Sequence, residues 1–223
     1  MYAKNRSMTS GLKWGVLAPV LVLTIVPAVV QAGTLYAGVG YGNTKIDSKG
    51  ACGTIGRVLN SGYTCSQDDK DNSWKLLGGY ELMRYLAFEF GYENLGKYTA
   101  SASGTARGTS TATTASSRFE AKGFNFSVVG MFPFTNELGV FARFGTFRWN
   151  VDASASTPNG GVSVKDTKPG FTPNNVGLGL KYSMNKTMDL RLEWERFKDV
   201  GDGLVTGQGD IDRMSLGLLY RFQ

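Results

Sequence analysis

The segment 72–97, NSWKLLGGYELMRYLAFEFGYENLGK, constrains the fold more than any other part of the chain. Successive side chains of a β-strand point to opposite faces, so large apolar residues at every second position predict a strand. Two such alternations meet at residues 83–85, and we predict two antiparallel strands joined by a short turn there. One face of this hairpin carries Trp74, Leu76, Tyr80, Leu82, Leu86, Phe88, Phe90 and Tyr92.

The opposite face of the hairpin is unusual for a soluble protein. It carries Lys75, Glu81, Glu89 and Glu93, interleaved with small residues. A soluble half-buried strand turns its large side chains to a packed core and its polar side chains to water. In a closed barrel within lipid, by contrast, the large apolar side chains face acyl chains and the charges line a narrow interior. The hairpin therefore favours a lipid-embedded barrel.

Six further segments alternate in the same way. They are 34–45, 118–132, 138–151, 174–182, 188–197 and 213–223. The pattern is weakest in 138–151, where both faces carry aromatic residues. Long polar segments follow every other strand, at 46–71, 98–117, 152–173 and 198–212. The tract 98–117 consists mostly of Ser, Thr, Ala and Gly, and we predict a mobile external loop there.

The number of strands and the two lengths of connection predict one architecture. Long loops at one end and short turns at the other, with an even number of strands, are typical of outer-membrane barrels. We predict an all-β fold, an eight-stranded antiparallel up-and-down transmembrane β-barrel, formed by residues 33–223 as one domain. A soluble lipocalin-type barrel is the alternative, with its apolar face turned inward around a ligand. Membrane fractionation and heat-modifiable gel migration distinguish the two.

Residues 1–32 have the three parts of a secretory signal peptide: a basic beginning, an apolar run over 14–30 and small or polar residues before a cleavage site after Ala32. A membrane anchor is the alternative, but two prolines interrupt the run, and it is shorter than the roughly 20 residues that a spanning helix needs. Cleavage removes three cations and lowers the formal net charge from +6 to +3. A charge this small gives no reason to expect nucleic acid as a partner.

The two cysteines, Cys52 and Cys65, lie in a stretch without alternation. In an exported chain, we predict a disulfide that closes one loop. Such a loop constrains the unfolded chain by roughly 3 kcal/mol. Two thiols without any histidine are too few ligands for a metal site, and we expect no metal or cofactor.

Four segments in order resemble the transmembrane barrel of the outer-membrane protein A (OmpA) family. They are 74–97, 139–152 (GVFARFGTFRWNVD), 176–195 (VGLGLKYSMNKTMDLRLEWE) and 214–223 (MSLGLLYRFQ). The resemblance implies an interior that is plugged by charge pairs and a pore that is narrow or closed. It also implies an outer-membrane location. The peptidoglycan-binding domain usual in the family is expected to be absent, because the sequence stops at Gln223.

The resemblance assigns roles to a few interior residues. Glu89 and Arg191 match an acid and an arginine of the family's gating pairs, and we predict that they form a lumen charge pair. Val129 and Lys181 stand where the family has a lysine and a glutamate, so the second pair is altered. The strand register places further charges in the lumen: Lys75, Glu81, Glu93, Arg143, Lys181, Asp189, Glu193, Glu195 and Arg221.

These charges allow two interpretations. They could form a conduction path, or they could be a satisfied polar core, because an eight-stranded barrel has only enough room for side chains to fill and buried charges persist when paired. We favour the polar core. Catalysis is not expected: Glu193 and Glu195 could do acid–base work, but the chain has no histidine to activate a serine.

The expected function is that of an integral outer-membrane barrel with a structural role, and a narrow, low-conductance pore for ions or small solutes is a further expectation. The alternative is a surface-loop adhesin or a phage or host receptor, because loops on a rigid scaffold commonly carry binding. The expected partners are outer-membrane lipid and lipopolysaccharide, the barrel assembly machinery and periplasmic chaperones. We expect a monomer. Tyr220 and Phe222 on the last strand fit an assembly signal for the outer membrane.

Overall fold

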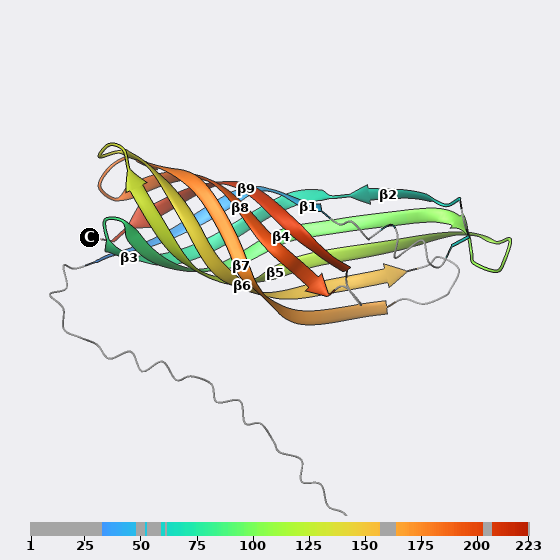
Figure 1. The fold of residues 1–223 in the computed structure, drawn as a ribbon. Helices are drawn as coiled ribbons and strands as arrows, with labels where there is room; N and C mark the ends of the chain where they lie inside the picture. The colour runs from blue at the N-terminus through green and yellow to red at the C-terminus, as the bar shows by residue number, and fades with distance from the viewer. Residues whose placement is uncertain are drawn as a thin grey trace, which may run out of the picture. The chain divides into compact units, whose positions relative to one another are not determined.

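The computed structural model describes residues 33–47, 52, 59–60, 62–156, 164–202 and 207–222. The predicted signal peptide, 1–32, lies outside the described residues. Within them the chain forms nine β-strands (Figure 1): β1(Thr34–Asp47), β2(Thr64–Asp68), β3(Lys70–Met83), β4(Leu86–Thr105), β5(Ala112–Pro133), β6(Leu138–Ser156), β7(Val164–Ser183), β8(Met188–Asp202) and β9(Gly207–Arg221). None of these residues belongs to a helix that is long and apolar enough to cross a membrane.

Eight of the strands close into a ring. Each pairs antiparallel with its neighbours in the order β4-β3-β1-β9-β8-β7-β6-β5, and the β4–β5 pairing completes the circle. The predicted eight-stranded barrel is confirmed. The short strand β2 is additional: among the described residues it pairs only with β4, at the stretch of β4 that continues past its pairing with β3.

The strands of the barrel are strongly tilted. A row of paired residues that starts at Lys122 on β5 passes through Asn94, Trp74 and Tyr41 and returns to β5 at Phe132, ten positions further along the strand. For eight strands this stagger requires a tilt of about 40° to the barrel axis. A barrel of this size has an interior that side chains can fill.

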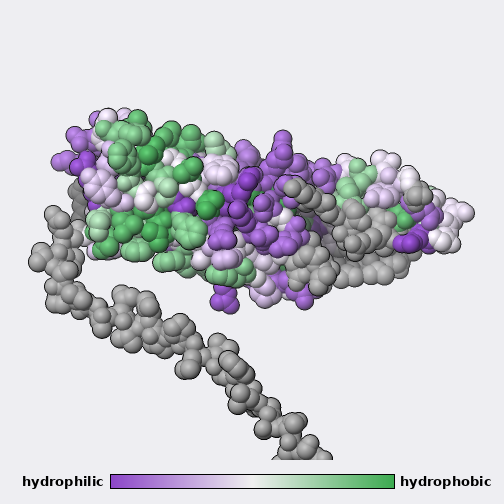
Figure 2. Space-filling model, in the orientation of Figure 1, coloured by the Kyte–Doolittle hydropathy of each residue, from purple (hydrophilic) through white to green (hydrophobic). Residues whose placement is uncertain are grey.

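The two faces of the wall are as the alternation predicts. Large apolar side chains form an exposed apolar belt around the barrel, which Figure 2 shows as the green region. The belt includes Leu35, Val39, Tyr41, Trp74, Leu76, Phe88, Phe90, Phe124, Phe126, Phe132, Phe144, Leu178, Leu180, Leu192, Met214, Leu216, Leu218 and Tyr220. The charged side chains between them on β3, β4, β6 and β8 are buried inside. Phe141 and Phe147, which blurred the pattern of β6, both point inward.

The expectation of four long loops is wrong for much of their length, because the strands run on beyond the apolar belt. β4 reaches Thr105 and β5 resumes at Ala112, so most of the Ser/Thr tract 98–117 is a paired hairpin rather than a mobile loop. Likewise, β6 continues to Ser156 and β7 begins at Val164. Backbone pairing and small buried side chains order these segments without the large apolar residues that a lipid-facing strand requires.

These strand continuations form an extension at the loop end of the barrel, that is, the end opposite the short turns at 84–85, 134–137 and 184–187. Its own small core contains Leu59, Ala100, Ala102 and Ala115. Hydroxyl groups link the strands outside this core, with Ser103 Oγ 3.1 Å from Thr114 Oγ1.

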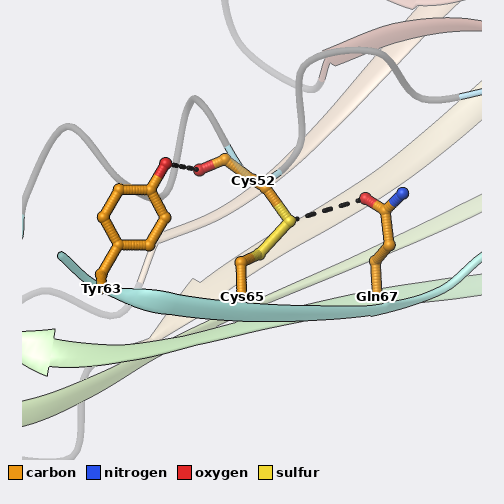
Figure 3. Close-up of a disulfide and its surroundings, with 4 residues drawn as sticks. All are labelled: Cys52, Tyr63, Cys65 and Gln67. Atoms are coloured by element: carbon orange, nitrogen blue, oxygen red, sulfur yellow. Dashed lines mark hydrogen bonds between the residues drawn. A yellow bond between two sulfur atoms is a disulfide. The ribbon is translucent and has the colours of Figure 1, made fainter.

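The predicted disulfide between Cys52 and Cys65 is confirmed, and it ties the segment before β2 to β2 itself (Figure 3). The two Cα atoms are 5.9 Å apart. The hydroxyl of Tyr63 donates a hydrogen bond of 3.2 Å to the carbonyl oxygen of Cys52, and the side chain of Gln67 lies beside the Cys52 sulfur. The disulfide therefore belongs to the extension and not to the barrel wall within the apolar belt.

Candidate functional site

The barrel interior is filled in three layers. Along β6, from the turn end to the loop end, the inward residues are Phe141, then Arg143, then Phe147 and Trp149. Along β9, Leu219 comes first and Arg213 follows before Ile211. Apolar side chains thus lie on both sides of a charged centre.

The members of each layer are as follows. The turn-end apolar layer contains Tyr36, Leu77, Ala87, Val129, Met131, Phe141 and Leu219. The central charge layer contains Lys75, Glu89, Glu93, Arg143, Arg191, Glu193, Glu195 and Arg213, each at most 4% exposed. The loop-end apolar layer contains Ile46, Leu95, Tyr98, Ala121, Phe147, Trp149, Val151, Phe197, Val200 and Ile211.

Glu89 on β4 is held by three neighbours. Arg191 on β8 donates a hydrogen bond of 2.6 Å from Nη1 to Glu89 Oε1, and the hydroxyl of Tyr36 donates to the same oxygen at 2.6 Å. Arg143 on β6 donates to the other carboxylate oxygen. The structure therefore brings the predicted pair into contact and adds Arg143 and Tyr36 to it.

Arg143 connects Glu89 on β4 to the two acids of β8, Glu193 and Glu195. Its Nη1 donates to Glu195 Oε1 at 2.8 Å, and its Nε lies 3.1 Å from Glu193 Oε1. Lys75 bridges the same two acids, with a bond to Glu193 and one of 3.0 Å to Glu195 Oε2. The acids alternate with cations, so each carboxylate faces at least one positive charge.

Arg213 completes the layer near its loop end. Its Nε donates to Glu195 Oε2 at 2.9 Å, and its Nη1 lies 3.2 Å from Glu93 Oε2. The amide of Asn125 donates to the other oxygen of Glu93 at 2.9 Å.

Aromatic rings of the two apolar layers pack against the arginines of the central charge layer. The guanidinium carbon of Arg191 lies 4.5 Å from the centroid of the Phe141 ring, and that of Arg213 lies 5.2 Å from the centroid of Phe197. Guanidinium groups stack favourably on aromatic faces. Each boundary of the central charge layer is therefore an arginine against a ring.

The central charge layer is electrically balanced, with four cations and four carboxylates among the eight residues. Desolvated charges are tolerable only when they are paired and hydrogen-bonded. A balanced, closed network of this kind is suited to filling space in a barrel. In the residues that the structure describes, no group of side chains has the composition of a metal site.

The sequence profile described as the OmpA-like transmembrane domain matches residues 30–223. The chain belongs to this family. Outer membrane protein A of Serratia marcescens is 27% identical over 202 residues, which cover 89% of this chain and 52% of that protein. Outer membrane protein A of Salmonella typhi is 30% identical over 146 residues, which cover 65% of this chain and 38% of that protein. The chain thus spans about half the length of these relatives or less.

Among solved structures, Ail, the attachment invasion locus protein of Yersinia pestis, is 14% identical with a TM-score of 0.50, covering 85% of this chain and 99% of that one. At this identity the likeness shows the fold alone. The resemblance to the OmpA family is confirmed, and this OmpA-like protein is a multi-pass β-barrel of the outer membrane. Its short turns therefore face the periplasm and its extension faces outward.

The remaining predicted lumen charges of this OmpA-like barrel lie near its periplasmic end. Arg221 donates hydrogen bonds to Asp189 and, at 3.0 Å, to Ser183 Oγ. Lys181 is half-buried, with its ammonium 3.7 Å from the sulfur of Met131, and Glu81 is also half-buried. These residues continue the buried charges from Arg191, which is paired in register with Lys181, toward the periplasmic end.

Two members of the network were not singled out from the sequence. Arg213 lies an even number of residues before Ser215 and Leu219 on the last strand, so the alternation of that strand predicts that its side chain faces the lumen. Tyr36 lies on the glycine-rich face of β1, where its hydroxyl reaches Glu89. Val129 is buried in the turn-end apolar layer. Tyr220 and Phe222 point outward, 50% and 52% exposed, with ring centroids 5.2 Å apart.

Proposed function

We propose that this protein is a structural outer-membrane barrel whose interior is closed to ions at rest, and that it holds a stiff extension above the membrane. The observation that carries the proposal is the three-layer interior. The central charge layer is neutral in sum and lies between two clusters of buried apolar side chains, so an ion entering the barrel would meet apolar side chains on either side of the charges.

The physical reason is the cost of moving an ion through an apolar constriction. Hydrophobic constrictions exclude water and act as closed gates, and here one lies on each side of the charges. Glu89 already accepts hydrogen bonds from both Arg143 and Arg191, so a passing ion would have to displace partners that are buried and hydrogen-bonded. This favours the structural role over the narrow pore that the sequence also allowed.

Planar-bilayer recording of the purified full-length barrel tests the proposal. We expect no steady conductance from the natural protein, and intermittent conductance from a Phe141→Ala, Phe147→Ala, Phe197→Ala variant, in which both apolar layers are hollowed. Phe126→Ala, on the lipid-facing side of the same wall, is the control. Steady conductance in the natural protein that changes in Glu89→Gln and Arg191→Gln would contradict the proposal and support a pore.

Surface recognition is a second candidate, and the extension favours it. In the extension, β4 and β5 are paired from Lys97 opposite Glu120 to Thr105 opposite Ala112. β2 pairs with β4, and the disulfide links β2 to Cys52. Such a platform holds its outward side chains in fixed positions, which lowers the entropic cost of binding.

The test is to shorten the β4–β5 hairpin without disturbing the barrel. Thr99 and Arg118 are paired in register, so Asn-Gly in place of residues 100–117 gives a two-residue hairpin turn. Heat-modifiable gel migration verifies the fold, and adhesion of bacteria displaying each form to cultured epithelial cells is the readout. Loss of adhesion supports recognition by the extension, and equal adhesion counts against it.

A further inference from the structure

The charges above the apolar belt are unevenly distributed around the ring. The segments 97–122 and 148–168, on the half formed by β4, β5, β6 and β7, contain seven basic and three acidic residues. The segments 45–71 and 196–212, on the half formed by β8, β9, β1 and β3, contain six basic and eight acidic residues. Figure 2 shows hydrophilic surface between the apolar belt and the extension. One half of the loop end is therefore net positive and the other is net negative.

The outward cations of the positive half are centred on β5, and we call this side the basic face. They are Lys97, Arg118, Lys122 and Arg148. Two acids lie among them: Lys122 Nζ is 3.1 Å from Asp152 Oδ2, and Lys97 Nζ is 3.9 Å from Glu120 Oε2. Among the described residues, no carboxylate forms an ion pair with Arg118 or Arg148. The basic face thus keeps an excess of positive charge.

The outward acids of the other half are centred on β9, and we call this side the acidic face. They are Asp47, Asp199, Asp210 and Asp212. Asp47 and Asp210 are paired in register, and like charges directly opposite each other in a sheet repel. Arg196 lies among these acids, but it already binds Asp212 with two hydrogen bonds of 2.7 Å.

Two lysines flank the acidic face without neutralising it. Lys45 Nζ lies nearest to Asp69, at 4.0 Å, and Lys198 is exposed on β8. The face still has four acids for three cations, and the repelling pair of Asp47 and Asp210 lies at its centre. A cation supplied from outside would relieve that repulsion.

The two faces point in opposite directions. In the ring of eight strands, β9 is the fourth strand from β5 whichever way the ring is followed. The same holds for β8 and β4 and for β1 and β6, which flank the two centres. The basic and acidic faces therefore lie on diametrically opposed sides of one barrel.

The two faces also lie at nearly the same height above the membrane. The paired row of Gly130, Ala142, Leu178, Trp194 and Met214 rises from β5 to β9 by about 3 Å per strand, or about 12 Å in all. Lys122 precedes Gly130 by eight residues on β5, which at this tilt places it about 20 Å above Gly130. Asp210 precedes Met214 by four residues on β9, which places it about 22 Å above Gly130.

Nothing within the belt selects one side of the barrel over another, because lipid tails are as apolar as the side chains that face them. Every copy has its turns in the periplasm, so two copies in one membrane meet side to side with their charged bands level. Exposed ion pairs are individually weak, but complementary charge determines which surfaces meet. The partner that fits the acidic face is thus a surface with the charge and height of the basic face.

We propose that a second copy of this chain docks with its basic face on the acidic face of the first. Because the two faces of one barrel are opposed, each docked copy leaves one face of each kind open, and the contact generates a row rather than a closed ring. This departs from the monomer expected from the sequence, since only the closed ring places the two faces opposite each other. The closed interior proposed above does not depend on this contact.

Cysteine cross-linking of the full-length protein in isolated outer membranes tests the contact. Asn150→Cys lies beside Lys122 on the basic face, and Gln208→Cys lies beside Asp210 on the acidic face; both positions are exposed and uncharged. Oxidation of the double variant should give a ladder of dimers, trimers and longer species on denaturing gels. The matched control is Asn72→Cys, Phe171→Cys, an exposed pair on the opposed strands β3 and β7, which should stay monomeric.

Charge reversal separates a specific contact from random collision. In the Asn150→Cys, Gln208→Cys background, Lys122→Glu, Arg148→Glu should reduce the ladder to the level of the control pair, and so should Asp47→Lys, Asp210→Lys. The variant with both faces reversed should recover it, because complementarity is restored. Heat-modifiable gel migration verifies each fold, and Lys122→Gln, Arg148→Gln or Asp47→Asn, Asp210→Asn replaces a reversal that does not fold.

Three results would overturn the proposal. The first is an equal ladder from the control pair, and the second is a ladder that survives reversal of one face. The third is cross-linking that stops at a dimer or occurs with Asn150→Cys alone, since the same face would then meet itself.

Discussion

At the scale of residues, the interior is held together by contacts between strands that lie far apart in the sequence. Glu89 binds Arg191 and Arg143, which are 102 and 54 positions away. In water such pairs contribute little, but in a dry interior a missing partner leaves a buried charge uncompensated. Each residue of the central charge layer therefore contributes to stability mainly because its removal would leave a buried charge without a partner.

Replacing Glu89 with Ala should destabilise the barrel by about 3–5 kcal/mol, because Arg191 and Arg143 lose a shared carboxylate while they stay buried. The measurement is the heat-unfolding midpoint in detergent, followed by gel migration. Glu81→Ala, at a half-buried position near the periplasmic end, is the control and should have a much smaller effect. An unchanged midpoint for Glu89→Ala would show that this carboxylate is not needed there.

Two adjacent glycines should respond in opposite ways to the same change. A Cβ at Gly79 would lie 2.2 Å from the Tyr36 ring inside the barrel, whereas a Cβ at Gly78 faces outward, with its nearest neighbour 3.9 Å away. Gly79→Val should cost about 1–3 kcal/mol by overpacking and should displace the Tyr36 hydroxyl from Glu89. Gly78→Val should be tolerated. Equal unfolding midpoints for the two variants would contradict the prediction that Gly79 faces the packed interior and Gly78 faces outward.

At the scale of elements, strands such as β4 and β5 extend well beyond the apolar belt. β4 has 20 residues and β5 has 22, although a strand needs only about 9–11 to cross a bilayer. The remainder is ordered by hairpin pairing, by a small core and by the disulfide, and its outer surface faces water.

Removing the disulfide with Cys52→Ser, Cys65→Ser should affect the extension and spare the barrel. The covalent link acts on β2, which pairs only with β4 among the described strands. Limited proteolysis of the folded protein should cut the extension faster in the variant. The heat-modifiable shift of the barrel should stay the same, and a loss of that shift would mean that the disulfide supports the whole fold.

The sequence predicted the barrel wall well and the extension poorly, for a physical reason. Lipid requires large apolar side chains at alternate positions, so the belt left a clear pattern from Leu35 to Tyr220. Outside lipid, the Ser, Thr and Ala residues of 98–117 are compatible with a strand as well as with a loop. The backbone pairing of β4 with β5 determines that they form strands. The interior shows a similar limit. The alternation of the strands predicts that Glu89, Arg191 and Arg143 face the lumen, but the contact between Arg143 and Glu89 depends on how the closed barrel brings β4 and β6 together.

At the scale of the whole molecule, the last strand has a double role. β9 closes the ring against β1, and it ends with the outward rings of Tyr220 and Phe222. Phe222→Ala should reduce the amount of assembled barrel in the outer membrane severalfold, because the proposed assembly signal is weakened while the interior is untouched. The measurement is the heat-modifiable fraction in isolated membranes. Phe126→Ala, in the middle of the belt, should assemble normally, and equal losses in both variants would argue against a special signal.

The balanced interior has a consequence for the order of events during biogenesis. Lys75 on β3 meets Glu193 on β8, which is 118 positions later in the chain, and Glu89 on β4 meets Arg191 on β8, so these pairs cannot form while the polypeptide is still an open sheet. An open sheet that entered lipid would carry Lys75, Glu89 and Arg191 without these partners. Curling into a cylinder and crossing into the hydrocarbon must therefore happen together, and every copy that is fully inserted has already completed its circle.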